Sequence, residues 1–135
     1  LAAGHSAGGH LAAWLLARSP AAGAALPVSG VFWLEPLLPT SINAGLGLDA
    51  AAARALSPAL LPAPGRPLHA VVGAEESGAF IRQTEAFASL WGGTSERIAG
   101  TNHFTVLDPW ANTSHPLMAV AEKLARQAGA GLTNL

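Results

Sequence analysis

The chain has 135 residues, of which 50% are hydrophobic and 11% are charged, and its formal net charge is −1. This length and composition fit one domain with a buried core, so residues 1–135 are assigned to a single domain. The small net charge excludes the basic surface that nucleic-acid binding needs, and the absence of cysteine excludes disulfides and thiolate chemistry. Prolines and glycines within the uncharged run 19–34 argue against a membrane-spanning helix, and we expect a cytoplasmic protein without a membrane partner.

The first motif is the pentapeptide Gly4-His5-Ser6-Ala7-Gly8, a G-x-S-x-G pattern that runs directly into an apolar helical stretch, 11–16. In that order of parts, a serine sits on a sharp turn between a strand and a helix. We expect glycine at Gly4 and at Gly8 because Cβ atoms would collide in such a turn. The turn also directs the first backbone N–H groups of the helix toward an oxyanion beside the serine. The motif therefore predicts Ser6 as a nucleophile and the Ala7 N–H as half of an oxyanion hole.

The next segments alternate between apolar runs and polar breaks. Ser19-Pro20 ends the first helix, and the run 28–34, apolar on both faces, predicts a strand buried in a parallel sheet. Residues 37–47 lack a period and are expected to form an irregular crossover or pocket-lining loop. Asp49 is expected to cap a short helix that ends near Leu56.

The second half of the chain repeats this alternation. Residues 68–73 predict a second buried strand, residues 80–91 an amphipathic helix, and residues 97–99 a short last strand. Ser114 is expected to cap a final helix with Pro116 in its first turn. The buried stripe of that helix is expected to consist of Leu117, Val120, Ala121 and Leu124. Alternating strands and helices predict an α/β fold, with a parallel sheet and helices on both of its faces.

A serine hydroxyl needs a base to accept its proton, and the base needs an anion that fixes its tautomer. The chain offers these groups in the order serine, acid, histidine, each after a predicted strand. His103 follows the last strand and is the candidate base. Glu75 and Glu76 directly follow the strand that ends at Gly73, and spacing alone leaves the choice between them open.

The remaining histidines fit the role of base less well. His5 and His10 precede the acid in the chain. His69 lies within a predicted strand, and His115 belongs to a helix start. No histidine pair with a carboxylate has metal-ligand spacing on one helix face, so we expect neither a metal site nor an organic cofactor.

At these residues the chain resembles the kynurenine formamidase (arylformamidase) branch of the α/β-hydrolases, particularly its bacterial members. Residues 4–11 are similar to that family's nucleophile turn, residues 76–83 to its acid loop, and Asn102-His103-Phe104 to its histidine loop. Similar segments between these motifs extend the resemblance over nearly the whole chain: 29–32, 34–37, 40–43, 46–49 and 56–58.

The resemblance implies Ser6 as nucleophile, Glu76 rather than Glu75 as the acid, and His103 as general base. It implies hydrolysis of an aryl formamide such as N-formylkynurenine to formate and a free amine, in tryptophan breakdown and without a cofactor. A carboxylesterase for short acyl esters is the close alternative because the same residues cleave both bonds. A non-catalytic interaction protein or inactive fragment is the alternative of another class. The expected partner is a small-molecule substrate, and a homodimer stays open.

Three departures from the family pattern accompany this resemblance. Glu76 stands where an aspartate is usual, which adds a methylene to the acid, and Trp33 stands where a small or acidic residue is common. The family's His-Gly-Gly loop, which supplies a second oxyanion donor, precedes the nucleophile and is not in these residues. We therefore expect the C-terminal portion of an α/β-hydrolase domain with its N-terminal strands missing, inactive and poorly soluble by itself.

Overall fold

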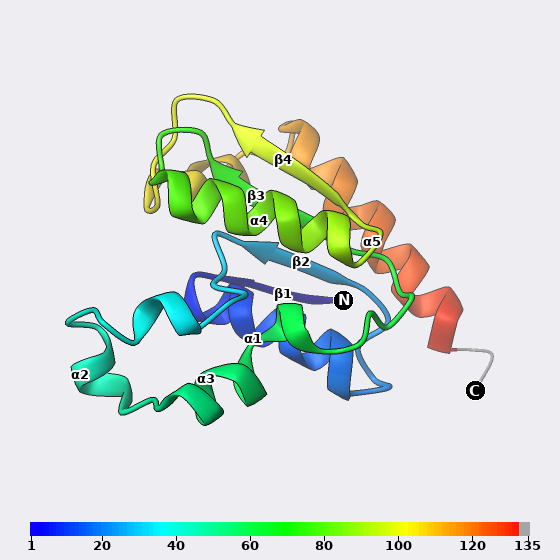
Figure 1. Cartoon of the computed structure of the whole chain (residues 1–135). Helices are drawn as coiled ribbons and strands as arrows, with labels where there is room; N and C mark the ends of the chain where they lie inside the picture. The colour runs from blue at the N-terminus through cyan, green and yellow to red at the C-terminus, as the bar shows by residue number, and fades with distance from the viewer. Residues whose placement is uncertain (133–135) are drawn as a thin grey trace.

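The computed structural model of the chain describes residues 1–132, which form a single parallel sheet with flanking helices (Figure 1). The four strands are adjacent in chain order: β1 (Ala2–His5), β2 (Ala25–Val28), β3 (His69–Gly73) and β4 (Thr94–Ile98). Ala2 pairs with Ala25, and His69 pairs with Thr94. Because all the strands are parallel, their carboxyl ends lie along one edge of the sheet.

Each strand is followed by helical structure. The α-helices are α1 (Ala7–Arg18), α2 (Asn43–Leu46), α3 (Ala50–Leu56), α4 (Gly78–Leu90) and α5 (Pro116–Leu132). Short 3-10 helices are η1 (Glu35–Leu37), η2 (Pro58–Leu60) and η3 (Thr105–Ala111). Among residues 1–132, no helix is both long and apolar enough to cross a membrane.

The helices cover both faces of the sheet, as predicted. On one face, Leu16 of α1 and Phe87 of α4 belong to the same buried cluster, in which the rings of Phe87 and Phe32 stack at 4.0 Å. On the other face, Leu117 and Leu124 of α5 pack against β2 and β3. In Figure 1, α4 crosses in front of the sheet and α5 runs behind it. The structure is therefore a three-layer α/β arrangement with a core on each side of the sheet.

The predicted strand at 28–34 is wrong, because β2 ends at Val28. The next residue, Ser29, has a φ of 47°, which a strand cannot accommodate. The backbone beyond it bonds to side chains instead of to a neighbouring strand: Gln83 Oε1 accepts from the N–H groups of Phe32 and Trp33 at 2.9 and 3.0 Å. The run is apolar because Phe32 and Leu34 enter the core from a loop. The periodicity of apolar residues cannot distinguish a buried loop of this kind from a buried strand.

Most other elements agree with the sequence-based expectations. Ser19 ends α1, and the Asp49 carboxylate accepts from the Ala52 N–H at 2.7 Å at the start of α3. The predictions for 68–73, 80–91 and 97–99 correspond to β3, α4 and β4, the last beginning earlier than expected. Residues 37–47 are largely irregular and contain the one-turn helix α2.

The predicted cap at Ser114 is wrong by one residue. Helix α5 begins at Pro116, and Nδ1 of the preceding His115 accepts from the Leu117 N–H at 3.2 Å. An imidazole nitrogen in that position satisfies one of the N–H groups that the first helical turn leaves without a partner. The predicted buried stripe of this helix is confirmed, with Val120 and Ala121 partly buried beside Leu117 and Leu124.

Candidate active site

Ser6 occupies the single residue between β1 and α1 and has a strained backbone. Its φ and ψ are 56° and −115°, a conformation that L-residues rarely adopt. The Ser6 N–H donates to the Val28 carbonyl at 2.9 Å, and the Ser6 carbonyl accepts from the His10 N–H at 3.1 Å. These bonds tie the turn to the end of β2 and to the first turn of α1, so the Ser6 side chain projects at the carboxyl edge of the sheet.

The two glycines of the motif have different roles. A Cβ atom on Gly4 would lie 2.4 Å from the Gly8 carbonyl oxygen, so the turn requires glycine at that position. Beyond its chain neighbours and the backbone of its own helix, a Cβ on Gly8 would meet no atom within 4 Å among residues 1–132, so the expected collision there is wrong. Gly9 is the second crowded position, since its Cβ would lie 2.8 Å from the Val28 carbonyl oxygen.

His103 is held in a tight loop between β4 and η3. The Asn102 side-chain oxygen accepts from the N–H groups of Phe104 and Thr105 at 2.9 and 3.1 Å. The Thr105 hydroxyl in turn accepts from the Asn102 N–H at 2.9 Å. This reciprocal pair closes the backbone around His103, and the imidazole side chain remains 27% exposed.

Glu76, not Glu75, contacts the imidazole. One carboxylate oxygen of Glu76 accepts from His103 Nδ1–H at 2.7 Å. The other oxygen accepts from the Gly73 N–H at 2.9 Å and from the Ser29 hydroxyl. The Glu76 side chain is 1% exposed, whereas Glu75 is exposed. Spacing could not choose between neighbouring glutamates, but the direction in which the loop turns each side chain does.

Ser6, His103 and Glu76 form a continuous hydrogen-bonded array, although 97 residues separate the serine from the histidine. The Ser6 hydroxyl donates to His103 Nε2 at 3.1 Å, while Nδ1–H donates to Glu76. Because a carboxylate can only accept, Glu76 assigns the imidazole proton to Nδ1 and leaves Nε2 free to accept. This geometry can transfer a proton from the serine hydroxyl to the imidazole, which is how a serine becomes a nucleophile.

Ala7 is the first residue of α1 and is exposed. The first N–H groups of an α-helix have no acceptor within the helix and lie at the positive end of its dipole. The Ala7 N–H therefore begins a cluster of donors directly after Ser6, where negative charge on a neighbouring oxygen is favourable. The second oxyanion donor that the resemblance implies belongs to the family's His-Gly-Gly loop, which is not in these residues.

Aromatic rings surround His103. The Phe80 ring lies 4.8 Å from the imidazole centroid, and the Phe104 ring lies 5.6 Å away in an edge-on arrangement. Phe104 is 78% exposed, which is unusual for a phenylalanine. The His5 ring lies 4.7 Å from that of His103, and its Nε2–H donates to the His103 carbonyl at 2.7 Å.

Several side chains that support the array were not identified from the sequence as site residues. His5 and Ser29 contact His103 and Glu76 directly. His10 Nδ1–H donates to the Val31 carbonyl at 2.8 Å, so both histidines of the G-H-S-A-G-G-H run secure neighbouring loops. The pairing of a histidine with a carbonyl far away in sequence has no local signal, so only the folded chain reveals it.

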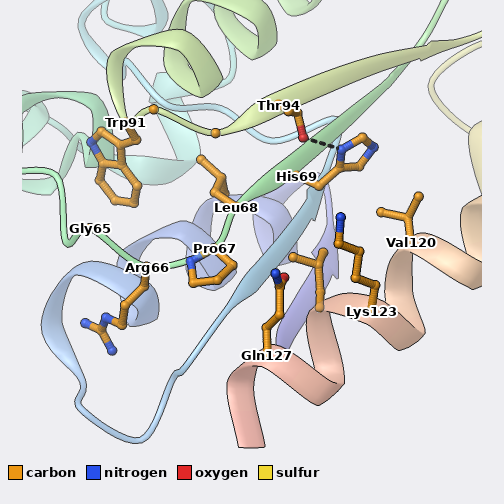
Figure 2. A pocket seen from close by; sticks show the side chains of 13 residues that line it. Gly65, Arg66, Pro67, Leu68, His69, Trp91, Thr94, Val120, Lys123 and Gln127 are labelled. Carbon is orange, nitrogen blue, oxygen red and sulfur yellow. Dashed lines mark hydrogen bonds between the residues drawn. The ribbon is translucent and has the colours of Figure 1, made fainter. Parts of the chain in front are cut away.

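An open groove of about 710 Å³ lies away from this array, at the amino ends of β3 and β4 (Figure 2). His69 lies along the groove and bonds through Nδ1 to the Thr94 hydroxyl at 2.8 Å. Arg66 at its rim points away from His69 and donates to carbonyls at the end of α1, including that of Ser19 at 2.7 Å. Ligands of open parallel sheets bind beyond the carboxyl ends of the strands, where Ser6 lies.

Metal-binding side chains do not gather in the part of the chain that the structure describes. Within residues 1–132, no group of three or more histidine, aspartate or glutamate side chains is close enough to hold a metal ion. His5, His10, His69 and His115 all bond to protein groups.

The parallel sheet, the serine on its strand-to-helix turn and the following acid and histidine define the α/β-hydrolase fold. A candidate thioesterase from Silicibacter sp. TM1040 has a similar structure, with a TM-score of 0.81 and 35% identity over 87% of this chain. An acylaminoacyl peptidase from Pyrococcus horikoshii is similar over 78% of the chain, with a TM-score of 0.61 and 18% identity. A structure from work on carboxylesterases of Nitrososphaera gargenis covers 92% of the chain, with a TM-score of 0.58 and 17% identity.

The chain spans only part of these proteins. It covers 48% of the Silicibacter protein, 20% of the Pyrococcus peptidase and 65% of the Nitrososphaera protein. No protein-family model matches the sequence. The similarity therefore establishes the α/β-hydrolase fold. The reaction and its substrate have to be inferred from the residues of the site.

Proposed function

We propose that this chain carries the nucleophile, base and acid of a serine hydrolase: Ser6, His103 and Glu76, respectively. The single observation that supports this assignment is the hydrogen-bonded array in which Ser6 Oγ lies 3.1 Å from His103 Nε2 and Glu76 lies 2.7 Å from Nδ1. Both distances lie within the hydrogen-bonding range that proton transfer requires.

In the proposed reaction, Ser6 Oγ attacks the carbonyl carbon of the substrate while His103 Nε2 takes the hydroxyl proton. The resulting oxyanion accepts a hydrogen bond from the Ala7 N–H at the start of α1. His103 then gives its proton to the leaving nitrogen, oxygen or sulfur as that bond breaks, which leaves an acyl group on Ser6. Glu76 keeps the imidazole oriented and stabilises its positive charge.

Water completes the cycle. His103 accepts a proton from a water molecule as the water oxygen attacks the acyl-Ser6 ester. The new oxyanion occupies the same position beside the Ala7 N–H. When the ester bond breaks, Ser6 Oγ recovers its proton from His103 and the carboxylic acid leaves, so the array returns to its starting state.

The first candidate substrate is an aryl formamide such as N-formylkynurenine, which would be cleaved to formate and an arylamine. The sequence resemblance to the arylformamidase branch, spread over the nucleophile, acid and histidine segments, supports this choice. The rings of Phe80 and Phe104 beside His103 also support it, because they offer apolar, polarisable surface to an aromatic leaving group.

The second candidate is a short acyl ester or thioester. Its support is the 35% identity with the candidate thioesterase of Silicibacter and the fold shared with carboxylesterases. The proposed chemistry is the same for all three bonds up to the protonation of the leaving group, since the attack is always by Ser6 on a carbonyl carbon. The pocket that selects the substrate decides between them.

A direct substrate comparison tests the proposal. The full-length protein is assayed with N-formylkynurenine, p-nitrophenyl acetate and a short acyl thioester, and the Ser6→Ala variant serves as the control. We expect N-formylkynurenine to give the highest kcat/KM, and Ser6→Ala to lose on the order of a thousandfold or more in kcat. An untouched formamide with rapid ester or thioester cleavage would replace the first candidate by the second.

A covalent probe tests hydrolase function without assuming a substrate. A fluorophosphonate reacts with a serine only where a base activates it. We expect labelling of the folded wild-type protein at Ser6 and none of the Ser6→Ala or heat-unfolded protein. A folded wild-type protein that stays unlabelled, and that cleaves none of the three substrates, would favour a non-catalytic interaction protein.

A further inference from the structure

A fully buried serine, Ser29, contacts the carboxylate that faces His103. Ser29 is the residue directly after β2 and is 0% exposed, and its hydroxyl donates to Oε1 of Glu76. The second oxygen, Oε2, accepts from His103 Nδ1–H at 2.7 Å. The Gly73 N–H is the other donor to Oε1, at 2.9 Å. The two oxygens thus have different partners: Oε1 bonds to groups of the sheet and of the residue after β2, and Oε2 bonds to the imidazole.

Ser29 makes this contact from an unfavourable backbone conformation. Its φ is 47°, in the left-handed region where a Cβ atom is crowded and where glycine is the usual residue. The Ser29 N–H donates to the Val71 carbonyl at 2.7 Å, which fixes the residue between β2 and β3. A non-glycine residue keeps such a conformation only where its surroundings enforce it, and such outliers concentrate at functional sites. A glycine at this position would remove the strain but would also remove the hydroxyl.

We propose that Ser29 is a positioning residue that holds the Glu76 carboxylate in the orientation required by His103. A glutamate side chain has one more rotatable bond than an aspartate, so its carboxylate needs more anchoring to face the imidazole. Without the Ser29 hydroxyl, Oε1 keeps only the Gly73 N–H, and the carboxylate can rotate away from Nδ1. The effect on rate rests on the proposed hydrolase function, whereas the effect on the imidazole does not.

The consequence for His103 can be measured in the absence of any substrate. Glu76 holds the neutral imidazole as the Nδ1–H tautomer, because its oxygen accepts from that nitrogen. If Ser29 holds Glu76, loss of the hydroxyl weakens this preference, and the Nε2–H tautomer becomes populated. Histidine nitrogen chemical shifts, measured by NMR at a pH where the imidazole is neutral, distinguish the two tautomers.

Two substitutions separate the hydroxyl from the backbone. Ser29→Ala removes the hydroxyl and keeps the strained Cβ, whereas Ser29→Gly removes both. We expect Ser29→Gly to have a higher Tm than Ser29→Ala, because glycine adopts a positive φ freely. We expect both variants to show the Nε2–H tautomer of His103 and to lose about tenfold to a hundredfold in kcat. If Ser29 has a purely structural role, Ser29→Gly is instead a stable protein in which His103 keeps the Nδ1–H tautomer.

Ser57 supplies the matched control. It is also a serine with 0% exposure, but within residues 1–132 its hydroxyl bonds to backbone groups alone, donating to the Ala53 carbonyl at 2.6 Å and accepting from the Leu34 N–H at 2.9 Å. Ser57→Ala is expected to lower Tm and to leave the His103 tautomer as in the wild type. The proposal is overturned if folded Ser29→Ala and Ser29→Gly keep the wild-type tautomer. If the wild-type protein has no hydrolase activity, the proposed function is wrong, but the tautomer of His103 still tests the role of Ser29.

Discussion

Gly9 and Gly30 meet backbone to backbone where α1 passes the end of β2. A Cβ atom on Gly9 would lie 3.0 Å from the Gly30 Cα and 2.8 Å from the Val28 carbonyl oxygen. This close approach brings the start of α1, and with it Ser6, against the end of β2, which Ser29 directly follows. The distance between the nucleophile turn and the segment that carries Ser29 is therefore set by two residues without side chains.

Gly9→Ala is predicted to destabilise the protein, because neither backbone neighbour can move away cheaply. We expect a loss of about 1–3 kcal/mol in the free energy of unfolding, measured by urea denaturation. Gly8→Ala is the matched control one residue earlier. Beyond its chain neighbours and the backbone of its own helix, its Cβ would meet nothing within 4 Å among residues 1–132. Because alanine also favours helix, we expect a change of no more than about 1 kcal/mol, in the stabilising direction. Equal losses in both variants would contradict the proposed packing.

Glu76→Gln is predicted to impair catalysis far more than Glu75→Gln. A glutamine amide at position 76 can direct its NH₂ group toward His103 and favour the wrong imidazole tautomer. We expect kcat to fall by roughly a thousandfold or more, by analogy with the loss of the acid in other serine hydrolases. Glu75 is exposed, and His103 Nδ1 bonds to Glu76 instead, so substitution of Glu75 should leave kcat near the wild-type value. A larger loss from Glu75→Gln would reassign the acid.

His5→Phe is predicted to slow hydrolysis without unfolding the protein. Phenylalanine keeps a ring beside His103 but removes the Nε2–H that donates to the His103 carbonyl at 2.7 Å. We expect a loss of about tenfold in kcat. His5→Gln, which can offer an amide N–H to the same carbonyl, should recover part of that loss.

His69→Phe is the control for this experiment, because His69 bonds to Thr94 at the amino end of the sheet. Its substitution is expected to alter the Tm but not kcat. If His5→Phe and His69→Phe have the same effect on kcat, the bond between His5 and the His103 loop does not contribute to positioning.

Arg66→Met is predicted to destabilise the end of α1. The guanidinium donates to the carbonyls of Leu16, Ser19 and Ala22, groups that the helix end and the following turn leave available. Losing these charged hydrogen bonds should cost about 1.5–3 kcal/mol of unfolding free energy. Arg54→Met, which removes an exposed ion pair with Glu35 at 3.3 Å, should cost less than about 1 kcal/mol. Chemical denaturation of both variants makes the comparison.

The pair between Glu85 on α4 and Arg97 on β4 is predicted to give a pH-dependent contribution to stability. The hydrogen bond from Arg97 holds the pKa of the Glu85 carboxyl below its usual value. A carboxyl whose pKa is lowered in the folded state stabilises that state above the unfolded pKa, and the contribution disappears as the pH falls through the folded pKa. The Tm difference between wild type and Glu85→Gln should therefore be present at neutral pH and vanish in acid. High salt should reduce it at neutral pH, because both side chains are partly exposed to solvent.

Local signals in the sequence were sufficient for much of the secondary structure. Asp49 capped α3 as predicted, because a cap depends on a residue three positions away. The apolar run 28–34 misled because its burial is real, but the partners of its backbone include the side chains of His10, Ser57 and Gln83, which lie 21 to 51 residues away along the chain. The hydrophobicity of the segment indicates that it is buried, but it does not indicate which hydrogen-bond partners its backbone N–H and C=O groups find.

The sequence by itself determined the class of chemistry that can be proposed here. Two glycines around Ser6, an apolar helix after it, and an acid and a histidine in the right order all follow from residue types and short spacings. Residue spacing left Glu75 and Glu76 open and the family resemblance favoured Glu76, but only the tertiary structure showed which of them contacts His103, and only it brought Ser29 and His5 to the site. Those decisions depend on contacts between residues 27 to 98 positions apart, and such contacts exist only once the strands have aligned their carboxyl ends at one edge of the sheet.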